Sequence, residues 1–418
     1  MTQAIQMPQS ILRPDWLAIE GGPRVREAAF AGWPSFQADE IAAAAEVLKS
    51  GKINYRTGEQ GRKFEKEFAE YTGSGHAVAV ANGTVALELA LCALGIGAGD
   101  EVIVPSRTFI ASASSVVMRG AVPVIADVDA TSGNVSAETI RPVLSAKTKA
   151  IIAVHLAGWP CEMDGIVELA RERGIRVIED CAQAHGATYR GRPVGSLGDA
   201  AAFSFCQDKI MTTGGEGGML TIGDEAAWER AASFRDHGTR HDAVGSQKEA
   251  RGGFGGFQWV HDSFGTNWRL TEMQSAIGRA QLRKLPRWVE ARSKNAAILR
   301  EGLRECIGLR VTAPPEEIGH AYYKYYVFVQ RECLRAGYDR DRILAAINAE
   351  GVPCFSGICS EIYREKAFPA EWRPLADCEV ARELGETSLM FPVHPTLREE
   401  DMLDTCAAVE KVMRAAVR

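Results

Sequence analysis

Three segments carry residue types that can do chemistry, and each follows or closes an apolar run typical of a strand. Asn82-Gly83-Thr84-Val85 opens a helical pattern, where backbone N–H groups and a hydroxyl can hold a phosphate or simply cap a helix. Asp180 ends the run Val177-Ile-Glu-Asp, and a buried acid there requires a cationic partner. Lys209 follows Phe203-Ser-Phe and precedes a glycine-rich turn. Taken singly, these residues favour plain readings: helix caps and a surface lysine.

Together, the three segments match the needs of pyridoxal 5'-phosphate. That cofactor requires a lysine for a Schiff base, a carboxylate that keeps its ring nitrogen protonated, a phosphate cup and a flat group against the ring. A loop and a strand fit between Asp180 and Lys209, so the two residues can reach neighbouring positions of one sheet. Lysine suits a covalent and proton-transferring role because its amine changes protonation readily when desolvated.

These residues must be positioned by the elements around them, and short apolar runs alternate with longer amphipathic runs from His76 onward. The predicted strands are His76–Ala81, Glu101–Pro105, Val122–Val128, Ala150–Leu156, Ile175–Glu179, Ala201–Phe205 and Gly218–Ile222. The helices predicted between them are Gly83–Leu94, Ile110–Met118, Ser136–Leu144 with Ser136 as N-cap, and Glu162–Arg173. This alternation predicts an α/β fold with a mostly parallel central sheet covered by helices on both faces.

The flanking regions predict further helices and a second domain. The predicted helices are Ala38–Ser50, Gly61–Tyr71, Trp228–Phe234, Leu270–Leu285, Asp339–Glu350 and Glu399–Val417, with a strand at Tyr322–Val329 and an exposed loop at Gly238–Ser263. Phe64, Phe68 and Tyr71 share one helix face and are expected to pack in the core. We therefore predict an N-terminal segment (1–36), a large domain (37–289) and a smaller C-terminal α+β domain (290–418).

Composition excludes several classes of function. The 418 residues include 48 Lys and Arg and 54 Asp and Glu, so the net charge of −6 gives no reason to expect nucleic acid or an anionic membrane as partner. The chain shows no apolar stretch of the ~20 residues that a membrane span needs, and Met1–Trp16 does not read as an export signal. Its ten cysteines are scattered, and Cys92, Cys181 and Cys206 are interpreted as core residues. We expect a cytoplasmic protein without a metal site.

A dinucleotide site is the first alternative, because Gly95-Ile-Gly-Ala-Gly99 looks like a glycine fingerprint. That fingerprint must follow a strand and open a helix, whereas these glycines precede the strand Glu101–Pro105. The segment is better interpreted as a turn that ends a helix. A nicotinamide-dependent oxidoreductase is therefore disfavoured.

Several motifs in fixed order resemble the DegT/StrS family of sugar aminotransferases, over most of the chain. They are Ala81-Asn-Gly-Thr, Pro105-Ser-Arg-Thr-Phe-Ile-Ala, Glu179-Asp-Cys-Ala-Gln-Ala-His-Gly, Phe203-Ser-Phe with Lys209, Gly215-Glu-Gly-Gly and Gly265-Thr-Asn-Trp-Arg-Leu-Thr-Glu. The resemblance implies the type I, aspartate-aminotransferase-like fold of pyridoxal phosphate enzymes. Related dehydratases carry histidine in place of the lysine, and Lys209 weighs against that branch.

The resemblance also implies a role for each matching residue. Lys209 would form the Schiff base and move the substrate proton, Asp180 would pair with the pyridine nitrogen, and Gln183 would bind the phenolic oxygen. Phe109 matches an aromatic residue on the ring face, although without the family core packing is the favoured interpretation. The phosphate cup matches Gly83, Thr84, Val85 and Ser204. Asn267 matches a residue that reaches the phosphate from a neighbouring subunit, which implies a homodimer with shared sites.

The implied reaction moves an amino group from glutamate or glutamine to a keto-sugar, for polysaccharide or antibiotic biosynthesis. A nucleotide-linked sugar is the first expectation for the acceptor. Gly21-Gly-Pro and Trp33-Pro resemble cyclitol aminotransferases, so a keto-cyclitol is the nearest alternative, and aminohydroxybenzoate-type synthases are a third branch. A non-catalytic sensor that holds the cofactor is a further alternative.

Four polar residues keep two interpretations each. His155 and His185 lie near strand ends, where they can approach a substrate or be hydrogen-bonded structural residues. Arg269 is either a substrate contact or a structural one. His237 and His241 are spaced like metal ligands on a helix, but without a third ligand a loop or interface role is favoured.

Overall fold

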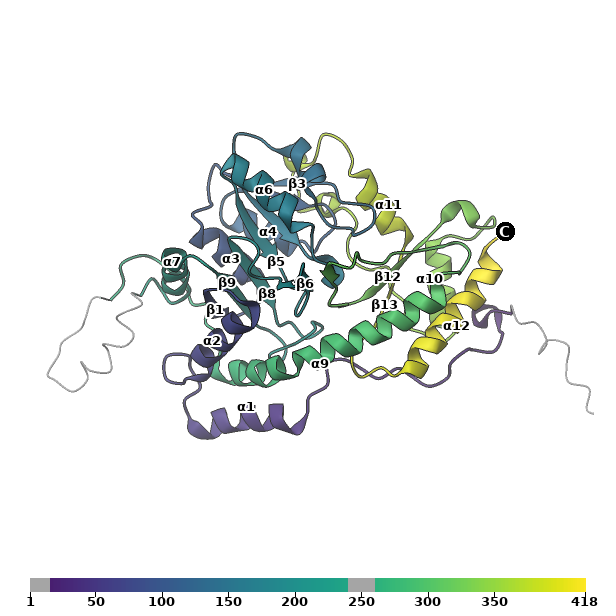
Figure 1. Ribbon diagram of the computed structural model, residues 1–418, viewed down its shortest axis with the longest axis horizontal. Helices are drawn as coiled ribbons and strands as arrows, with labels where there is room; N and C mark the ends of the chain where they lie inside the picture. Colours follow the sequence, from purple (N-terminus) through teal and green to yellow (C-terminus); the bar gives the residue numbers. More distant parts are fainter. Residues whose placement is uncertain (1–15, 240–259) are drawn as a thin grey trace, which may run out of the picture.

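The central sheet has seven strands in the order β1-β9-β8-β5-β4-β2-β3 (Figure 1). The computed structural model describes residues 16–239 and 260–418. The strands are β1 (His76–Val80), β2 (Glu101–Pro105), β3 (Val122–Ala126), β4 (Thr148–Val154), β5 (Arg176–Asp180), β8 (Ala200–Ser204) and β9 (Gly218–Ile222). Strands β8, β5, β4, β2 and β3 pair in parallel, whereas β9 is antiparallel to both of its neighbours. The prediction of a mostly parallel sheet is confirmed.

Helices cover both faces of this sheet, as predicted. Alternate residues of β1 show why, because Val78 and Val80 belong to one buried cluster and Ala77 and Ala79 to another. One face packs against α3 (Gly83–Ala93), α4 (Ala111–Met118) and α7 (Glu225–Arg235). The other packs against α2 (Gln60–Thr72), α5 (Ala137–Ile140) and α6 (Met163–Arg173). Phe64 and Phe68 of α2 are buried and Tyr71 packs against their cluster, which confirms the predicted core face.

A long helix, α9 (Glu272–Leu303), connects the sheet to the C-terminal part of the chain (Figure 1). That part contains an antiparallel sheet in the order β10-β12-β13, built from β10 (Leu309–Val311), β12 (Tyr325–Val329) and β13 (Ser388–Phe391). Its helices are α10 (Arg340–Ala349), α11 (Glu379–Thr387) and α12 (Glu399–Ala416). The boundary predicted at residue 290 falls inside α9, and the division into domains stays a prediction.

A third, small sheet ties the two parts together. It pairs β11 (Ile318–Gly319) with β6 (Thr188–Tyr189), and β6 with β7 (Arg192–Pro193). The segment that leads into β12 is thereby held against the loop that follows β5. Helix α1 (Ala38–Ser50) lies outside this frame, against α9 (Figure 1).

Several local predictions can be compared with the structure. Gly95 has a positive φ of 75° and its N–H donates to Cys92 O, so the glycine-rich segment is a helix-ending turn. Ser136 caps α5 as predicted, but that helix ends at Ile140 and a 3-10 turn follows at Arg141–Val143. The loop predicted at Gly238–Ser263 lies mostly outside the described residues, as do His241 and residues 1–15.

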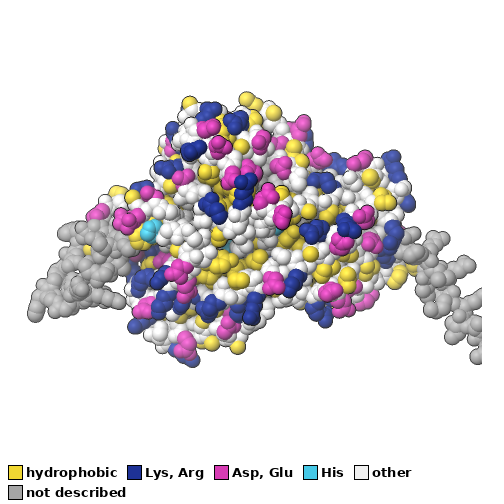
Figure 2. All heavy atoms as spheres, viewed as in Figure 1, with side chains coloured by type: hydrophobic (Ala, Val, Ile, Leu, Met, Phe, Trp, Pro, Cys, Tyr) yellow, Lys and Arg dark blue, Asp and Glu magenta, His cyan; other side chains and the backbone are white. Residues whose placement is uncertain are grey.

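The surface charges and the cysteines can be compared with what the composition predicts. On the face shown in Figure 2, basic and acidic side chains are interspersed and do not gather by sign. All ten cysteines are free. Of the three interpreted as core residues, Cys181 is buried, whereas Cys92 and Cys206 are only half-buried. Across residues 16–239 and 260–418, none of the helices is long and apolar enough to cross a bilayer.

Candidate active site

Asp180 and Lys209 are brought together by neighbouring strands. Asp180 ends β5, which pairs in parallel with β8, and Lys209 lies in the turn five residues beyond the end of β8. Burial raises the pKa of Asp180 above its usual value, and the positive charge of Lys209 acts against that shift. The two residues thus follow or end neighbouring parallel strands, and their charges interact.

The Asp180 carboxylate is fixed by two hydrogen bonds. Ser112 Oγ donates to Oδ2 at 3.0 Å and Ala182 N–H donates to Oδ1 at 3.1 Å. Ser112 is itself linked to Thr108 by a hydroxyl contact of 3.0 Å. Within the described ranges, no cationic side chain forms an ion pair with Asp180, so this buried carboxylate of raised pKa lacks a positively charged partner. A protonated ring nitrogen fits that requirement.

The start of α3 and the end of β8 form a narrow cradle. A Cβ atom on Gly83 would lie 2.6 Å from Ser204 Cβ, so only glycine allows this approach. Asn82 caps the helix by accepting from Val85 N–H at 3.0 Å. A helix leaves its first N–H groups without intrahelical acceptors, and with Val85 engaged the available donors are those of Gly83 and Thr84. The cradle fits a phosphate group, while the role of Val85 in it stays a prediction.

The side-chain amide of Gln183 is held in one orientation by a hydrogen bond. Its Oε1 accepts from Ala157 N–H at 2.8 Å, which leaves the Nε2 group to donate elsewhere. Ala157 adopts a left-handed conformation with φ of 58°, and its carbonyl accepts from Tyr323 N–H at 2.8 Å. Such conformations in residues other than glycine occur where the surroundings impose them, often at functional sites. An amide donor here suits the phenolic oxygen expected from the resemblance.

Phe109 is not a core residue. It lies in the turn between β2 and α4, and its side chain is 63% exposed. The alternative of ordinary core packing is therefore wrong. An exposed aromatic side chain at the carboxyl edge of the sheet, four residues past the end of β2, is available to stack on a flat ligand.

Two aromatic residues that the sequence did not predict as part of the site, Tyr323 and Trp33, contact Lys209. Its Nζ lies 5.0 Å from the Tyr323 ring centroid and 3.7 Å from Asp208 Oδ1. Tyr323 O–H donates to Asp208, and Trp33 Nε1 donates to the Lys209 carbonyl at 2.8 Å. Trp33 and Tyr323 are far from Lys209 in the chain, so only the fold reveals these contacts.

The two histidines near strand ends have different surroundings. His155 is fully buried: Nδ1 accepts from Cys161 N–H, so the proton on Nε2 donates to Glu179 at 3.0 Å. His155 is therefore a structural residue. His185 has no hydrogen-bond partner for either ring nitrogen in the described chain and is buried against Phe203. Burial, together with the charges of Lys209 and Arg292, lowers the pKa of His185 to about 3, so it is neutral.

Arg269 and Asn267 lie on the segment that follows the second undescribed stretch. Arg269 forms an ion pair with Asp236, which also pairs with Arg56 at 2.7 Å, so Arg269 makes a structural contact. Asn267 is exposed, and its backbone bridges to Asp236. Within the described part of this chain, Asn267 has no side-chain hydrogen bond to the other predicted site residues. Its expected action on a partner's phosphate stays a prediction.

Comparisons with known proteins agree with this geometry. Residues 34–410 match the model of the DegT/DnrJ/EryC1/StrS aminotransferase family. The chain is 38% identical over 355 residues to GDP-perosamine synthase of Caulobacter vibrioides, covering 84% of this chain and 89% of that protein. It is 36% identical over 394 residues to a putative L-glutamine:3-amino-2,3-dideoxy-scyllo-inosose aminotransferase of Streptoalloteichus tenebrarius, covering 90% of this chain and 89% of that protein.

A solved structure is similar over nearly the whole length. The aminotransferase from Psychrobacter cryohalolentis superposes with a TM-score of 0.89 at 52% sequence identity. The match covers 92% of this chain and 99% of that one. Both its fold and its class of activity are those expected from the motifs.

Proposed function

Because the chain belongs to the DegT/DnrJ/EryC1/StrS aminotransferase family, we propose that it binds pyridoxal 5'-phosphate and moves an amino group from glutamate or glutamine to a keto-sugar. The donor leaves as its keto acid and the acceptor becomes an amino sugar for polysaccharide or antibiotic biosynthesis. The enzyme acts as a cytoplasmic homodimer. Membership of the family establishes the aminotransferase activity. The cofactor, the substrates and the homodimer are proposed.

One observation carries the proposal: a buried carboxylate and a lysine amine meet at the carboxyl edge of neighbouring strands. Asp180 is 7% exposed and holds a raised pKa, and Lys209 is near enough to oppose that shift. The cradle at Gly83 and Ser204 and the exposed ring of Phe109 supply the remaining two requirements of the cofactor. Open α/β sheets bind ligands at this edge.

The residues have distinct tasks in the transfer. Bound pyridoxal phosphate supplies an electron-withdrawing ring that makes the proton on the substrate carbon removable. Asp180 would hold the ring nitrogen protonated by charge pairing, and the free Nε2 of Gln183 would donate to the phenolic oxygen. Lys209 Nζ would take the proton from the donor carbon and hold it for the return transfer. Asp208, 3.7 Å away, stabilises Lys209 while that amine is positively charged.

The acceptor is proposed to be nucleotide-linked. The GDP-perosamine synthase relative is one support. The positive charge near Lys209 is another, because Arg292 is fully buried near Tyr323, acts with Lys209 on the same neighbours and forms no ion pair with any described carboxylate. Burial lowers the pKa of Arg292 to about 9, so it stays positive near neutral pH. Anionic substrates gain from such a charge, whereas a neutral keto-cyclitol does not. The cyclitol alternative rests on the Streptoalloteichus tenebrarius relative.

The experiment follows the cofactor by its colour. Purified protein should be yellow, and glutamate or glutamine should convert the spectrum to that of the aminated cofactor. A panel of nucleotide-linked keto-sugars and free keto-cyclitols should then be screened for return of the original spectrum. Return with the cyclitols alone would assign the alternative substrate. A yellow protein inert to every amino donor would favour a sensor, and a colourless protein would refute the proposal.

A further inference from the structure

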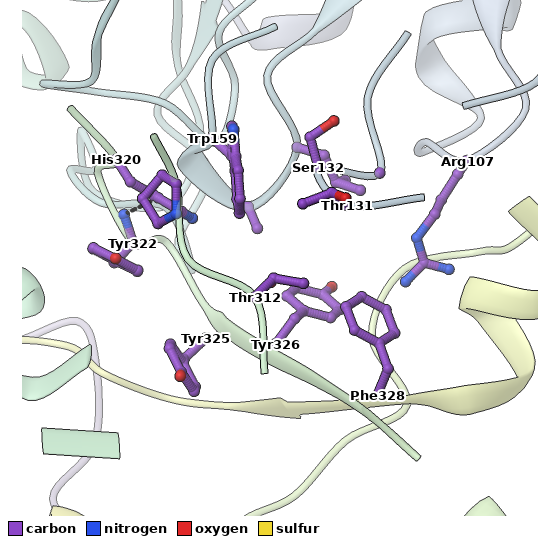
Figure 3. Close-up of a pocket in the computed structure, with 14 residues that line it drawn as sticks. Arg107, Thr131, Ser132, Trp159, Thr312, His320, Tyr322, Tyr325, Tyr326 and Phe328 are labelled. Carbon is purple, nitrogen blue, oxygen red and sulfur yellow. Dashed lines mark hydrogen bonds between the residues drawn. The ribbon is translucent and has the colours of Figure 1, made fainter. Parts of the chain in front are cut away.

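A small cavity lies beside the proposed cofactor site, between the central sheet and the segment that leads into β12 (Figure 3). It encloses about 40 Å³, more than the ~10–15 Å³ that one water needs. One wall is Ala157, whose N–H holds Gln183. Another is Tyr322, next to the tyrosine that contacts Lys209. The cavity is therefore linked to Gln183 through Ala157, and to Lys209 through the segment that carries Tyr322 and Tyr323.

Arg107 contributes a buried charge to this cavity. It follows the end of β2, is 1% exposed, and directs its guanidinium toward Tyr326 and Phe328 (Figure 3). Its Nη2 donates to Ser388 Oγ at 3.3 Å, whereas Nη1 has no partner. In the part of the chain that the structure describes, no carboxylate forms an ion pair with it. A buried charge without a counter-ion is unfavourable, so the fold retains Arg107 at a cost to its own stability.

Tyr326 supplies a second donor at the same place. Its ring centroid lies 5.8 Å from Arg107 Cζ, and its hydroxyl accepts from Ile358 N–H at 3.2 Å. That bond uses the oxygen as acceptor, so the hydroxyl proton stays available. Two donors, one of them positively charged, face a space with aromatic walls at Trp159 and Phe328.

We propose that this cavity binds a carboxylate or phosphate group of one of the two substrates, with Arg107 as the charged donor and Tyr326 as the neutral one. Its volume suits one small anionic group, with the rest of the substrate outside the cavity. The inference rests on the proposed function, because it gives the transferase a second anion site in addition to the phosphate cradle at Gly83 and Ser204.

Arg107→Met tests the proposal, with Arg310→Met as matched control. Arg310 Cζ lies 4.4 Å from the Phe328 ring centroid, outside the lining of the cavity, and Arg310 donates to Ala130 O at 3.1 Å. Calorimetric titration of the cofactor-loaded protein should use glutarate as an unreactive dicarboxylate, and UDP, GDP and dTDP as diphosphates. Arg107→Met should weaken one of the two classes about 10- to 100-fold, as expected for a charged hydrogen bond. Arg310→Met should leave both unchanged. The weakened class identifies the substrate whose anion the cavity holds.

Thermal stability without any probe gives a second reading. If Arg107 serves a ligand, Arg107→Met should melt at the same temperature as the unsubstituted protein or higher, because it removes an unpaired buried charge. Unchanged affinity for all probes would overturn the proposal. So would failure of both Arg107→Met and Arg107→Gln to fold, because Arg107 would then be a structural tie. Failure of the proposed function is distinguishable, since the unsubstituted protein would show no spectral change with amino donors.

Discussion

The lysine and the aspartate of the site stand in contrasting surroundings. Lys209 has a side chain 17% exposed, next to an exposed carboxylate, while Asp180 is enclosed and hydrogen-bonded. A proton-transferring amine must reach the substrate, whereas a group that holds charge on a ring benefits from a low dielectric. The difference in exposure therefore matches the division of tasks between the two residues.

Replacement of Lys209 tests the first of these tasks. Lys209→Ala should lower kcat by at least about 10³-fold, within the range for loss of a positioned acid–base group and before counting loss of the covalent step. The substitution leaves Asp180, Gly83 and Ser204 in place, so pyridoxal phosphate should still bind, measured by fluorescence titration. Near-normal turnover in this variant is incompatible with the mechanism.

Asp180 predicts a pH dependence of stability in the cofactor-free protein. Its folded pKa is raised above the ordinary 3.8, so the folded state binds this proton more tightly than the unfolded state does. The ionised group therefore destabilises the fold, and this penalty grows as the pH rises above 3.8 and through the folded pKa. Asp180→Asn removes the penalty, so its free energy of unfolding relative to the unsubstituted protein should increase from pH 4 to pH 7.

Urea unfolding at the two pH values measures this difference. Turnover of the loaded Asp180→Asn variant should fall at least about 10- to 100-fold, because a charged hydrogen bond to the ring is lost. A variant that gains stability and loses activity would show that Asp180 is kept for its partner. If Asp180→Asn were less stable at pH 7 than at pH 4, relative to the unsubstituted protein, Asp180 would be a structural residue.

At the scale of elements, the site depends on how closely α3 approaches β8. The Cβ of Gly83→Ala would lie 2.6 Å from Ser204 Cβ, so the helix start must move away from the strand. We expect a loss of about 1–3 kcal/mol in the free energy of unfolding, typical of overpacking. Affinity for pyridoxal phosphate should also fall, by about tenfold or more, because the cradle donors move.

Gly97→Ala is the matched control for this substitution. A Cβ on Gly97 would lie 3.5 Å from Arg119 O, an ordinary contact, and the residue has no positive φ. It should change neither stability nor cofactor affinity measurably. Equal affinity in Gly83→Ala and Gly97→Ala, by fluorescence titration, would remove Gly83 from the phosphate site.

The elements differ in how well the sequence predicts them. The predicted bounds of strand Glu101–Pro105 and helix Ala38–Ser50 are those of the structure. Local apolar patterning determines the strand, and the same kind of patterning with a glycine at the end determines the helix. The direction of β9 was not predictable, because pairing depends on distant partners. Strands β6, β7 and β11 have two residues each, too few for any periodic pattern.

The residues of the site also differ in how well the sequence predicts them. Gly83, Asp180, Ser204 and Lys209 follow or close apolar runs, and the rule that ligands bind at strand ends brings them together. Tyr323 gave no such signal, because it lies just ahead of a strand of another sheet and reaches Lys209 only through the fold. Arg107 is one residue of the motif Pro105-Ser-Arg-Thr-Phe-Ile-Ala, and the sequence does not single it out from its neighbours. Only the fold shows that it is buried without a carboxylate partner.

At the scale of the whole molecule, the surface around α1 favours a second subunit. Four apolar side chains on or beside this helix are 40–62% exposed: Phe36, Ile41, Leu48 and Ile53. The helix itself packs mainly against α9. Exposed apolar side chains clustered in this way are typical of protein interfaces. Together with the exposed Asn267, they agree with the proposed homodimer in which each subunit completes its partner's site.

Hybrid dimers test this sharing directly. Asn267→Ala alone should weaken the phosphate site and impair turnover, and Lys209→Ala alone should be inactive. Two differently tagged chains, one with each substitution, can be co-expressed and the mixed dimer purified. If Asn267 acts across the interface, one of the two sites receives both intact residues, and the hybrid should recover about half of the unsubstituted activity.

The reciprocal hybrid provides the control. A chain that carries both Lys209→Ala and Asn267→Ala, paired with an unsubstituted chain, leaves one site without its lysine and the other without the partner's asparagine, so activity should stay low. If Asn267 served its own subunit, the two outcomes would exchange: the first hybrid would be impaired and the second would keep about half of the activity. The pair of measurements thus distinguishes the two arrangements even where each hybrid folds equally well.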